Sequence, residues 1–281
     1  MKSGFAVLVG RSNVGKSTLL NALVGTKVAI TTPKPQTTRH AIQGVIHDPR
    51  GQAVIVDTPG VFSRIPDELT SKLNDKAKQS LKDIDLVLYV VDPTRHVGDE
   101  EQIVRRMVMA ADCPKVMVMN KSDLKGRFKH EFEAWEADFD AVIEVSASKG
   151  HNLNALKDAV FEYLPEGEPL YPDDMLTNLD REFRISELIR EKAFLALEEE
   201  VPYSVTAEVD EISERDNGML YIAARLITNA PRYKRMIVGG GGKTIKRIGQ
   251  SVRKELELVT DRKVFLDLQV EVDDRWQERF Q

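Results

Sequence analysis

The chain has 281 residues, of which 42% are hydrophobic and 30% are charged, so it is long enough for about two globular domains with apolar cores. Its formal net charge of −5 argues against a uniformly basic nucleic-acid binder, and no apolar run approaches the ~20 residues of a membrane span. The single cysteine, Cys113, excludes an internal disulfide and is typical of a reducing compartment.

The first predicted elements are a buried strand at residues 5–9 and a helix at residues 18–24 that ends at Gly25. Residues 10–17 between them read GRSNVGKS and fit G-x-x-x-x-G-K-[ST], the phosphate-binding loop. Backbone N–H groups of such a loop and of the helix N-terminus point at phosphate oxygens, while Lys16 reaches the β- and γ-phosphates and Ser17 ligates magnesium. The alternative is an ordinary strand-to-helix turn. The predicted phosphate-binding residues are Gly10, Arg11, Ser12, Asn13, Val14, Gly15, Lys16, Ser17 and Thr18.

Strand and helix patterns then alternate as far as residue 164. Apolar runs predict strands at residues 54–57, 86–92, 116–120 and 142–145. Helical patterns lie at residues 67–81, 100–111, 128–138 and 153–163. This alternation predicts an α/β fold, with a mostly parallel sheet covered by helices and a ligand at the carboxyl ends of the strands.

Asp57 ends the second predicted strand, and Thr58, Pro59 and Gly60 follow it directly. A carboxylate at this place can hold magnesium, mostly through water, because magnesium keeps part of its hydration shell. Gly60 can bring its amide close to a γ-phosphate without a side chain in the way. A plain turn is the alternative, but the distance of about forty residues from the phosphate-binding loop favours nucleotide binding.

Two further polar motifs end later strands and predict a guanine site. Asp123 in the NKSD motif can accept from both N1–H and the exocyclic amine of guanine, whereas adenine would leave the carboxylate unpaired. Lys121 can pack along the base, and Asn120 can tie the loops together. A backbone N–H of the Ser146, Ala147 and Ser148 loop can reach the guanine carbonyl, although this stretch by itself reads as a plain loop.

Together the motifs GRSNVGKS, DTPG, NKSD and SAS resemble those of a translation-factor-type GTPase of the Ras-like fold. The resemblance identifies residues 35–39 as the first switch, with Thr38 preferred over Thr37 as the hydroxyl that completes the magnesium shell. It thus implies three metal ligands, Ser17, Thr38 and Asp57.

Val61 departs from the Ras pattern, which has a water-orienting glutamine at this place, so slow intrinsic hydrolysis or another device is expected. In potassium-activated GTPases an asparagine placed like Asn13 ligates a monovalent cation beside the phosphates. The residues expected to act in hydrolysis are Lys16, Thr38, Gly60 and Asn13.

The second half of the chain begins after a proline-rich acidic connector at residues 165–174. A helix is predicted at residues 181–200, and two strands at 203–211 and 220–228 flank a hairpin signal, Asn217-Gly218. Two helices and a last strand at residues 264–272 follow, so the predicted order is α-β-β-α-α-β.

Gly239 to Gly242 lie between the last two predicted helices and contain G-x-x-G, the loop with which a KH domain clamps backbone nucleotides. A flexible glycine loop is the alternative, but the surrounding element order favours the KH domain. Apolar side chains of Ile237, Val238, Ile245 and Ile248 are expected to line the groove on which bases rest. The predicted RNA-binding residues are Arg232, Lys234, Arg235, Ile237, Val238, Gly239, Gly240, Gly241, Gly242, Lys243, Ile245, Lys246, Arg247 and Arg253.

A GTPase domain followed by a type II KH domain resembles the Era family over essentially the whole chain, including the PQTTRH switch and the entry to the KH strands at Val201, Pro202 and Tyr203. The resemblance implies a GTPase domain at residues 1–168, a linker at 169–179 and an RNA-binding KH domain at 180–281. It implies GTP hydrolysis, Mg²⁺, binding of 16S ribosomal RNA near its 3′ end, and assistance in assembly of the small ribosomal subunit. We expect a cytoplasmic monomer, with K⁺ as an optional activating ion. The sequence does not decide whether the protein also makes a weak peripheral contact with the membrane.

Two other classes of function compete with this interpretation. A metabolic nucleotide kinase shares the phosphate-binding loop, but the NKSD motif and the placement of DTPG argue against it. A GTPase that acts in tRNA modification or at membranes would lack the C-terminal domain that carries the G-x-x-G loop, so the sequence disfavours this class. The five histidines show no metal-ligand spacing.

Overall fold

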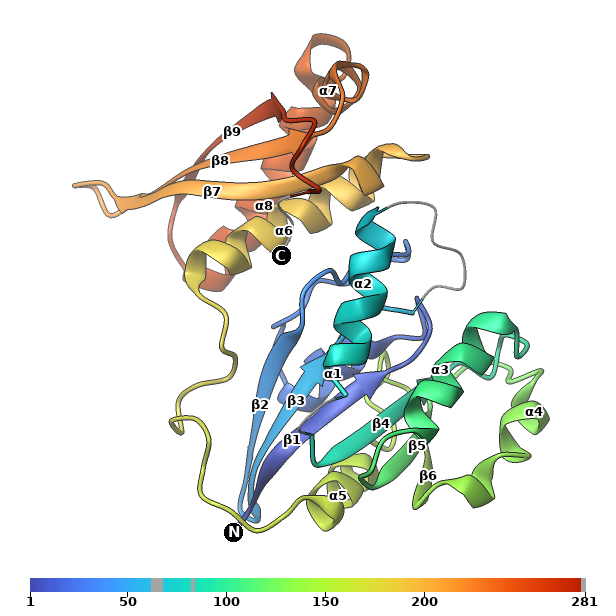
Figure 1. Cartoon of the computed structure of the whole chain (residues 1–281). Coiled ribbons are helices and arrows are strands. Elements are labelled where there is room, and N and C mark those ends of the chain that lie inside the picture. The colour runs from blue at the N-terminus through green and yellow to red at the C-terminus, as the bar shows by residue number, and fades with distance from the viewer. Residues whose placement is uncertain (62–67, 82–83, 279–281) are drawn as a thin grey trace. The chain divides into compact units, whose positions relative to one another are not determined.

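The computed structural model describes residues 1–61, 68–81 and 84–278, and these divide into two compact units, 1–178 and 179–281 (Figure 1). The first unit is built on a six-stranded sheet with the order β2-β3-β1-β4-β5-β6. Its strands are β1 (Lys2–Val9), β2 (Ile42–Asp48), β3 (Gly51–Asp57), β4 (Leu86–Val91), β5 (Lys115–Met119) and β6 (Ala141–Glu144). All pairs are parallel except β2 with β3, which confirms the mostly parallel sheet.

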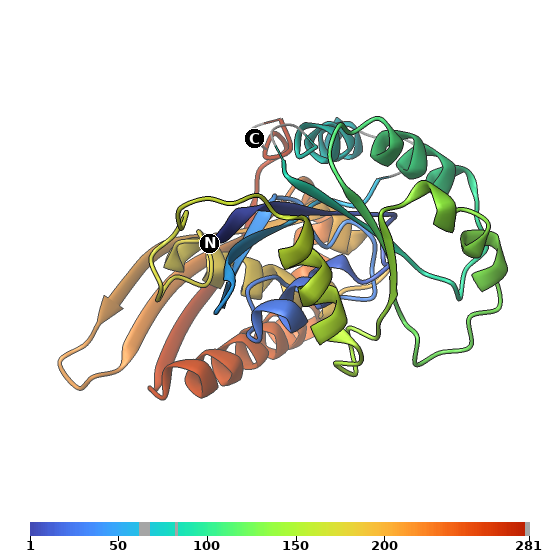
Figure 2. The same cartoon turned by 90° about the horizontal axis from the view of Figure 1, so that it is seen from below.

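Helices cover both faces of this sheet (Figure 2). The helices are α1 (Lys16–Val24), α2 (Glu68–Gln79), α3 (Asp99–Met109), α4 (Lys129–Glu133) and α5 (Leu153–Tyr163). Side chains of α2, α3 and α4, such as Val104 and Phe132, pack on one face against Val7, Tyr89 and Met117. Helices α1 and α5 contact each other and cover the other face. Residues that directly follow β1, β3, β4 and β5 therefore meet at one carboxyl-terminal edge.

Two features of the first unit differ from the sequence prediction. The edge strand β2 was not predicted, and it forms because Ile42, Val45 and Ile46 are buried while the missing side chain of Gly44 lets Leu20 of α1 approach. The helix predicted at residues 128–138 is wrong in its extent, since α4 ends at Glu133 and a 3₁₀ turn follows at Glu136–Asp138.

The predicted linker contacts the first unit along β2 and β3. The Gln52 side chain accepts from the backbone N–H groups of Leu170 and Tyr171 at 2.8 and 2.9 Å. Val45 N–H donates to the Leu176 carbonyl at 2.9 Å. These contacts explain why residues up to 178 group with the first unit. The expected boundaries at 168 and 180 stay a prediction.

The second unit is a three-stranded sheet packed against helices. Its elements are α6 (Arg181–Ala196), β7 (Val205–Glu214), β8 (Leu220–Thr228), α7 (Pro231–Val238), α8 (Lys243–Thr260) and β9 (Val264–Val272), which is the predicted α-β-β-α-α-β order. β7 and β8 are antiparallel, and β9 runs parallel to β8. Helix α6 is shorter than predicted because Leu197 turns to an extended conformation.

None of the helices in the described ranges is long and apolar enough to cross a membrane.

Candidate functional site

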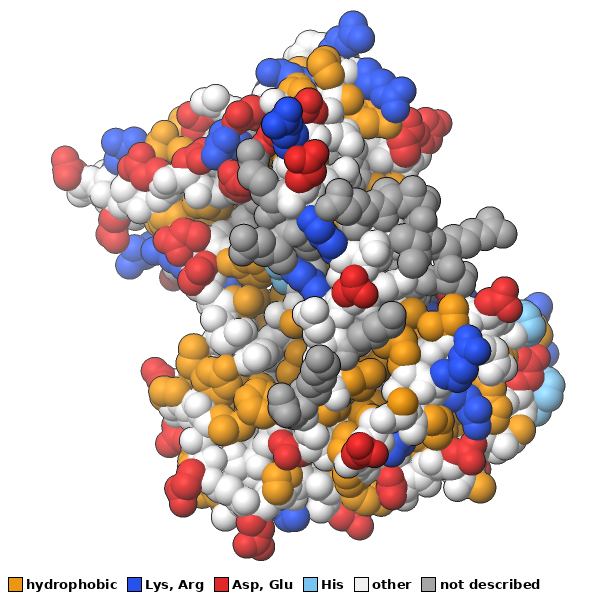
Figure 3. Space-filling view, in the orientation of Figure 1, with side chains coloured by type: hydrophobic (Ala, Val, Ile, Leu, Met, Phe, Trp, Pro, Cys, Tyr) orange, Lys and Arg blue, Asp and Glu red, His pale blue; other side chains and the backbone are white. Residues whose placement is uncertain are grey.

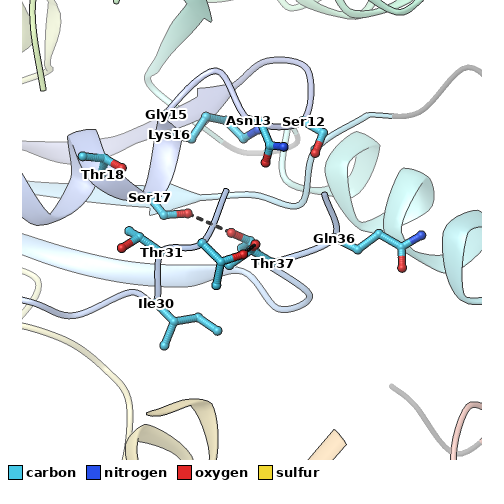
Figure 4. Close-up of a pocket in the computed structure, with 13 residues that line it drawn as sticks. Ser12, Asn13, Gly15, Lys16, Ser17, Thr18, Ile30, Thr31, Gln36 and Thr37 are labelled. Carbon is cyan, nitrogen blue, oxygen red and sulfur yellow. Dashed lines mark hydrogen bonds between the residues drawn. The ribbon is translucent and has the colours of Figure 1, made fainter. Parts of the chain in front are cut away.

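A polar pocket lies at the carboxyl-terminal edge of the first sheet (Figure 4). Residues of the 12–18 loop, residues of the 30–38 segment and Gly60 line it. Two glycines allow this loop to take its shape. Gly15 adopts a left-handed φ of +98°, and Gly10 has no side chain, whereas a Cβ there would lie 2.4 Å from the Val90 carbonyl oxygen. No side chain caps the N-terminus of α1, so its backbone N–H groups are available to an anion.

Lys16 is the buried cation of this pocket. Its Nζ donates to the carbonyl oxygens of Gly10 and Arg11 at 2.9 and 3.0 Å. Burial lowers the pKa of Lys16 to about 8, although the nearby carboxylates of Asp57 and Glu101 favour its charged form. A phosphate group beside Nζ would add negative charge and favour the ammonium further.

Ser17, Thr38 and Asp57 converge from three separate segments. Ser17 Oγ donates to Asp57 Oδ2 at 2.5 Å and lies 2.8 Å from Thr38 Oγ1, which donates to the same carboxylate oxygen at 3.3 Å. Asp57 is fully buried, burial raises its pKa, and Oδ1 has no hydrogen-bond partner within the described ranges. A buried carboxylate with an unpaired oxygen beside two hydroxyls fits the all-oxygen ligation that Mg²⁺ prefers.

The geometry favours Thr38 over Thr37 as the magnesium ligand. The Thr37 hydroxyl donates to the Lys34 carbonyl at 2.7 Å and lies 2.6 Å from Thr32 Oγ1, so it faces its own loop. In the parts of the chain that the structure describes, no group of three or more His, Cys, Asp or Glu side chains offers another metal site.

Gly60 lies against the phosphate-binding loop, where a Cβ would be 2.8 Å from Ser12 Cα. The next residue, Val61, forms a parallel β-bridge with Arg11, and its buried apolar side chain offers no group that could orient a water molecule. Thr58 is also buried, and its hydroxyl donates to the Leu8 carbonyl at 2.8 Å. Of the DTPG segment, Gly60 lines the pocket, and the Asp57 carboxylate contacts it through the hydroxyls of Ser17 and Thr38.

At the other end of the site, Asn120 joins the loops as the sequence predicted. Its Nδ2 donates to the Val14 carbonyl at 2.9 Å, and its Oδ1 accepts from Ala147 N–H at 3.0 Å. Lys121 Nζ donates to the Asn13 carbonyl at 3.0 Å and to Asp92 Oδ2 at 2.6 Å.

Asp123 presents an exposed carboxylate beside these loops. It accepts from Ser146 Oγ at 2.5 Å, which lowers the pKa of Asp123 and keeps it ionised. Ser148 lies near the same hydroxyl, with 3.3 Å between the two Oγ atoms. The polar groups expected to contact a guanine base are thus brought together by β5, β6 and the loops that follow them.

The side chains of two predicted phosphate-binding residues do not face the pocket. Val14 is fully buried in the core, and Arg11 is buried in an ion pair with Glu101. Both residues can contribute only their backbone groups to a phosphate.

In the second unit, a groove of about 330 Å³ lies between α8 and β9. Its lining residues are Ile245, Lys246, Gly249, Gln250, Arg253, Val264, Phe265, Leu266 and Leu268. The glycine loop precedes α8, and a Cβ at Gly240, Gly241 or Gly242 would meet open space. Because α8 begins without a side-chain cap, its N-terminal amides are available to a nucleic-acid phosphate.

Some predicted RNA-binding residues have other roles. Ile237 and Ile248 were expected to line the groove, but they are 0% and 1% exposed and belong to the core. The cause is the helical period, which turns these positions toward the sheet. Arg247 donates to the Ala196 carbonyl at 2.9 Å at the end of α6, and Arg232 stacks on Tyr233.

Lys234, Arg235, Lys243, Lys246 and Arg253 remain exposed around the loop and groove. Figure 3 shows Lys and Arg side chains at the end of this unit where α7 lies. Sequence reasoning missed the β9 side of the groove, Phe265, Leu266 and Leu268, although the alternation predicted the strand itself.

Comparison with known proteins agrees with the division of the chain into two units. Residues 5–121 match the family described as 50S ribosome-binding GTPase, and residues 200–277 match the KH domain. The chain is 41% identical to GTPase Era of Halothermothrix orenii over 281 residues, which cover 99% of this chain and 95% of that protein. It is 40% identical to GTPase Era of Geotalea uraniireducens, with coverage of 99% and 94%.

Two solved structures are similar over the same length. One is Era in complex with MgGDPNP and nucleotides 1506–1542 of 16S ribosomal RNA, and the other is a Tyr-to-Ala variant of Aquifex aeolicus Era bound to GDP and AlF₄⁻. Each has a TM-score of 0.93 and 38% sequence identity, and each alignment covers 99% of this chain and 96% of the other.

Proposed function

Because the chain belongs to the Era family of GTPases, we propose that it binds GTP, hydrolyses it, and binds 16S ribosomal RNA near the 3′ end through its KH domain. In this way it would assist assembly of the small ribosomal subunit. The observation that carries the proposal is that Lys16, Ser17 and Thr38 line one pocket and that both hydroxyls reach the buried carboxylate of Asp57. Asp123 is the carboxylate expected to contact a guanine base. The RNA assignment is supported by the glycine loop and the groove beside α8, and by the RNA bound to a similar Era.

The pocket suits in-line transfer of the γ-phosphoryl group to water. Water oxygen bonds to the γ-phosphorus and the bond from phosphorus to the β–γ bridging oxygen breaks. One proton of the water stays on the phosphate product, and the other is shared between that product and solvent. Lys16 offsets the charge on the β- and γ-phosphates, and the backbone of Gly60 approaches the γ-phosphate. Ser17, Thr38 and Asp57 would hold Mg²⁺, which supplies further charge neutralisation between the β- and γ-phosphates.

The proposal has three further parts. The GTPase domain spans residues 1–168, the linker 169–179 and the KH domain 180–281. The protein acts as a cytoplasmic monomer, and the nucleotide state sets how tightly it holds RNA. A weak peripheral contact with the membrane would be an addition to this role.

Lys16→Ala is expected to lower GTP turnover by a factor of about 100 or more, because a fixed cation beside the transferred phosphoryl group is lost. The measurement is release of phosphate from GTP and, separately, from ATP. The parent protein should prefer GTP strongly, and Lys34→Ala, at a lysine outside the pocket lining, should act like the parent. Equal turnover of GTP and ATP, or full activity without Lys16, would count against the proposed function.

Hydrolysis by the parent is expected to be faster in K⁺ than in Na⁺. Asn13 lies in the pocket with φ of +63° and donates from Nδ2 to the Pro33 carbonyl at 2.8 Å, so its side chain stands between the phosphate-binding loop and the switch segment. Val61 cannot orient the attacking water, so an ion at Asn13 would aid hydrolysis by another route, as positive charge beside the phosphates. Rates are compared in the two chloride salts at equal ionic strength, and Asn13→Ala should abolish the difference. Identical rates for the parent in both salts refute the potassium assignment.

A further inference from the structure

Arg11, the second residue of the phosphate-binding loop, directs its side chain into the protein. Its side chain is 5% exposed, and Nε lies 2.6 Å from Oε2 of Glu101 in the first turn of α3. The other carboxylate oxygen of Glu101 accepts from the Tyr89 hydroxyl at 2.5 Å, and Arg11 Nη1 donates to the His96 carbonyl at 3.1 Å. The Arg11 side chain therefore anchors the loop to α3 and to the segment before it, and Glu101 extends this link to Tyr89 of β4.

A contribution to the stability of the fold does not by itself explain the buried ion pair between Arg11 and Glu101. Glu101 is fully buried, and burial raises the pKa of its carboxyl group, since the charged form loses its water. Nη2 of Arg11 has no hydrogen-bond partner in the described part of the chain. The desolvation penalty of such a pair can exceed its Coulomb attraction, so well-packed apolar residues of similar volume are often equally or more stable.

The anchor fixes the part of the loop that holds Lys16. The carbonyl oxygens of Gly10 and Arg11 accept the Lys16 ammonium at 2.9 and 3.0 Å. The Arg11 backbone also pairs with Val61, next to the glycine that approaches the γ-phosphate. A second contact comes from Arg95, whose Nη1 donates to the Ser12 carbonyl at 3.0 Å.

We propose that Glu101 is a positioning residue of the nucleotide site. Acting through Arg11, it holds the carbonyl groups at residues 10 and 11 where they direct the Lys16 ammonium toward the transferred phosphoryl group. This inference rests on the proposed GTP hydrolysis. Small displacements of a catalytic charge lower the rate strongly, so a loop released from Glu101 would keep the nucleotide but transfer the phosphoryl group slowly.

The test replaces the pair by apolar side chains of similar length, Arg11→Met together with Glu101→Met. Because neither charge of the pair is left buried without its partner, we expect the thermal unfolding midpoint to stay close to that of the parent, the cost being the Tyr89 hydroxyl that loses its acceptor. We expect kcat for GTP to fall at least tenfold while KM and the affinity for GDP change less than threefold. A role confined to folding would leave kcat unchanged once the midpoint is preserved.

A second variant, Glu101→Gln, keeps the shape and one acceptor oxygen, so it decides the matter if the double variant fails to fold. It should bind GDP like the parent and show reduced kcat. Arg105→Met removes another ion pair of α3, with Asp138, that does not reach the loop, and should keep parental activity.

A folded double variant, or a folded Glu101→Gln protein, with kcat within threefold of the parent overturns the role of Glu101. A parent that hydrolyses no GTP refutes the proposed function itself and this inference with it.

Discussion

Asp123→Asn is expected to weaken GTP binding by about 100-fold or more and to make XTP the preferred nucleotide. The Asp123 carboxylate accepts from Ser146 Oγ on one oxygen and is otherwise exposed, with a pKa held below its usual value. An amide at this place has a single acceptor oxygen and places an N–H₂ group against the exocyclic amine of guanine. Xanthine carries a carbonyl there, so it pairs with the new donor.

The measurement is a competition between GTP and XTP for the same labelled GDP. Since Asn retains an acceptor for Ser146, the fold should survive, and the unfolding midpoint checks this. Asp112→Asn changes an exposed carboxylate elsewhere in the first unit and should leave both affinities alone. If Asp123→Asn protein still favours GTP over XTP as the parent does, the guanine site has been assigned to the wrong residue.

Gly240→Asp combined with Gly241→Asp is expected to lower RNA affinity by about 30-fold or more. The loop precedes the uncapped N-terminus of α8, where a backbone phosphate would be close to the glycines. Two carboxylates repel that phosphate and fill the space it needs. A Cβ at either position meets nothing within 4 Å, and only Gly241 has a left-handed φ, of +60°, which aspartate tolerates better than most residues.

RNA binding is measured at a stated salt concentration, because phosphate contacts make affinity depend on salt. Circular dichroism and GTP turnover without RNA should match those of the parent. The matched control is Gly218→Asp, which adds a carboxylate at a left-handed position in the hairpin of the same unit, at a residue that does not line the groove. Undiminished RNA affinity in the folded double variant would remove the glycine loop from the interface.

Much of the nucleotide site could be predicted because its residues lie in short motifs that directly follow strands. Parallel strands bring such ends to one edge, and this is why Gly10, Asp57 and Asn120 meet in the structure. The preference for Thr38 over Thr37 came from the resemblance to other GTPases, and the structure adds the physical reason, since only the Thr38 hydroxyl lies beside Ser17 and Asp57.

Other features depend on contacts between distant residues and carry little local signal. β2 is a short edge strand whose pairing with β3 and close approach to α1 through Gly44 come from the tertiary fold. Ile237 and Ile248 look like groove residues in sequence, yet the orientation of α7 and α8 turns them into the core. The Arg11 and Glu101 pair joins residues ninety positions apart, and neither belongs to a motif that requires the other.

The most direct test of the account is the affinity of the full chain for RNA of 16S nucleotides 1506–1542, the segment bound to a similar Era. Binding is titrated with Mg²⁺ and GDPNP, and again with Mg²⁺ and GDP, against an RNA of the same composition in scrambled order. The account predicts affinity at least tenfold higher with GDPNP than with GDP, and weaker binding of the scrambled RNA in both states. Equal affinity for this RNA with GDPNP and with GDP, equal affinity for the two RNAs, or no binding at all, would contradict a GTP-controlled grip on the 3′ end of 16S ribosomal RNA.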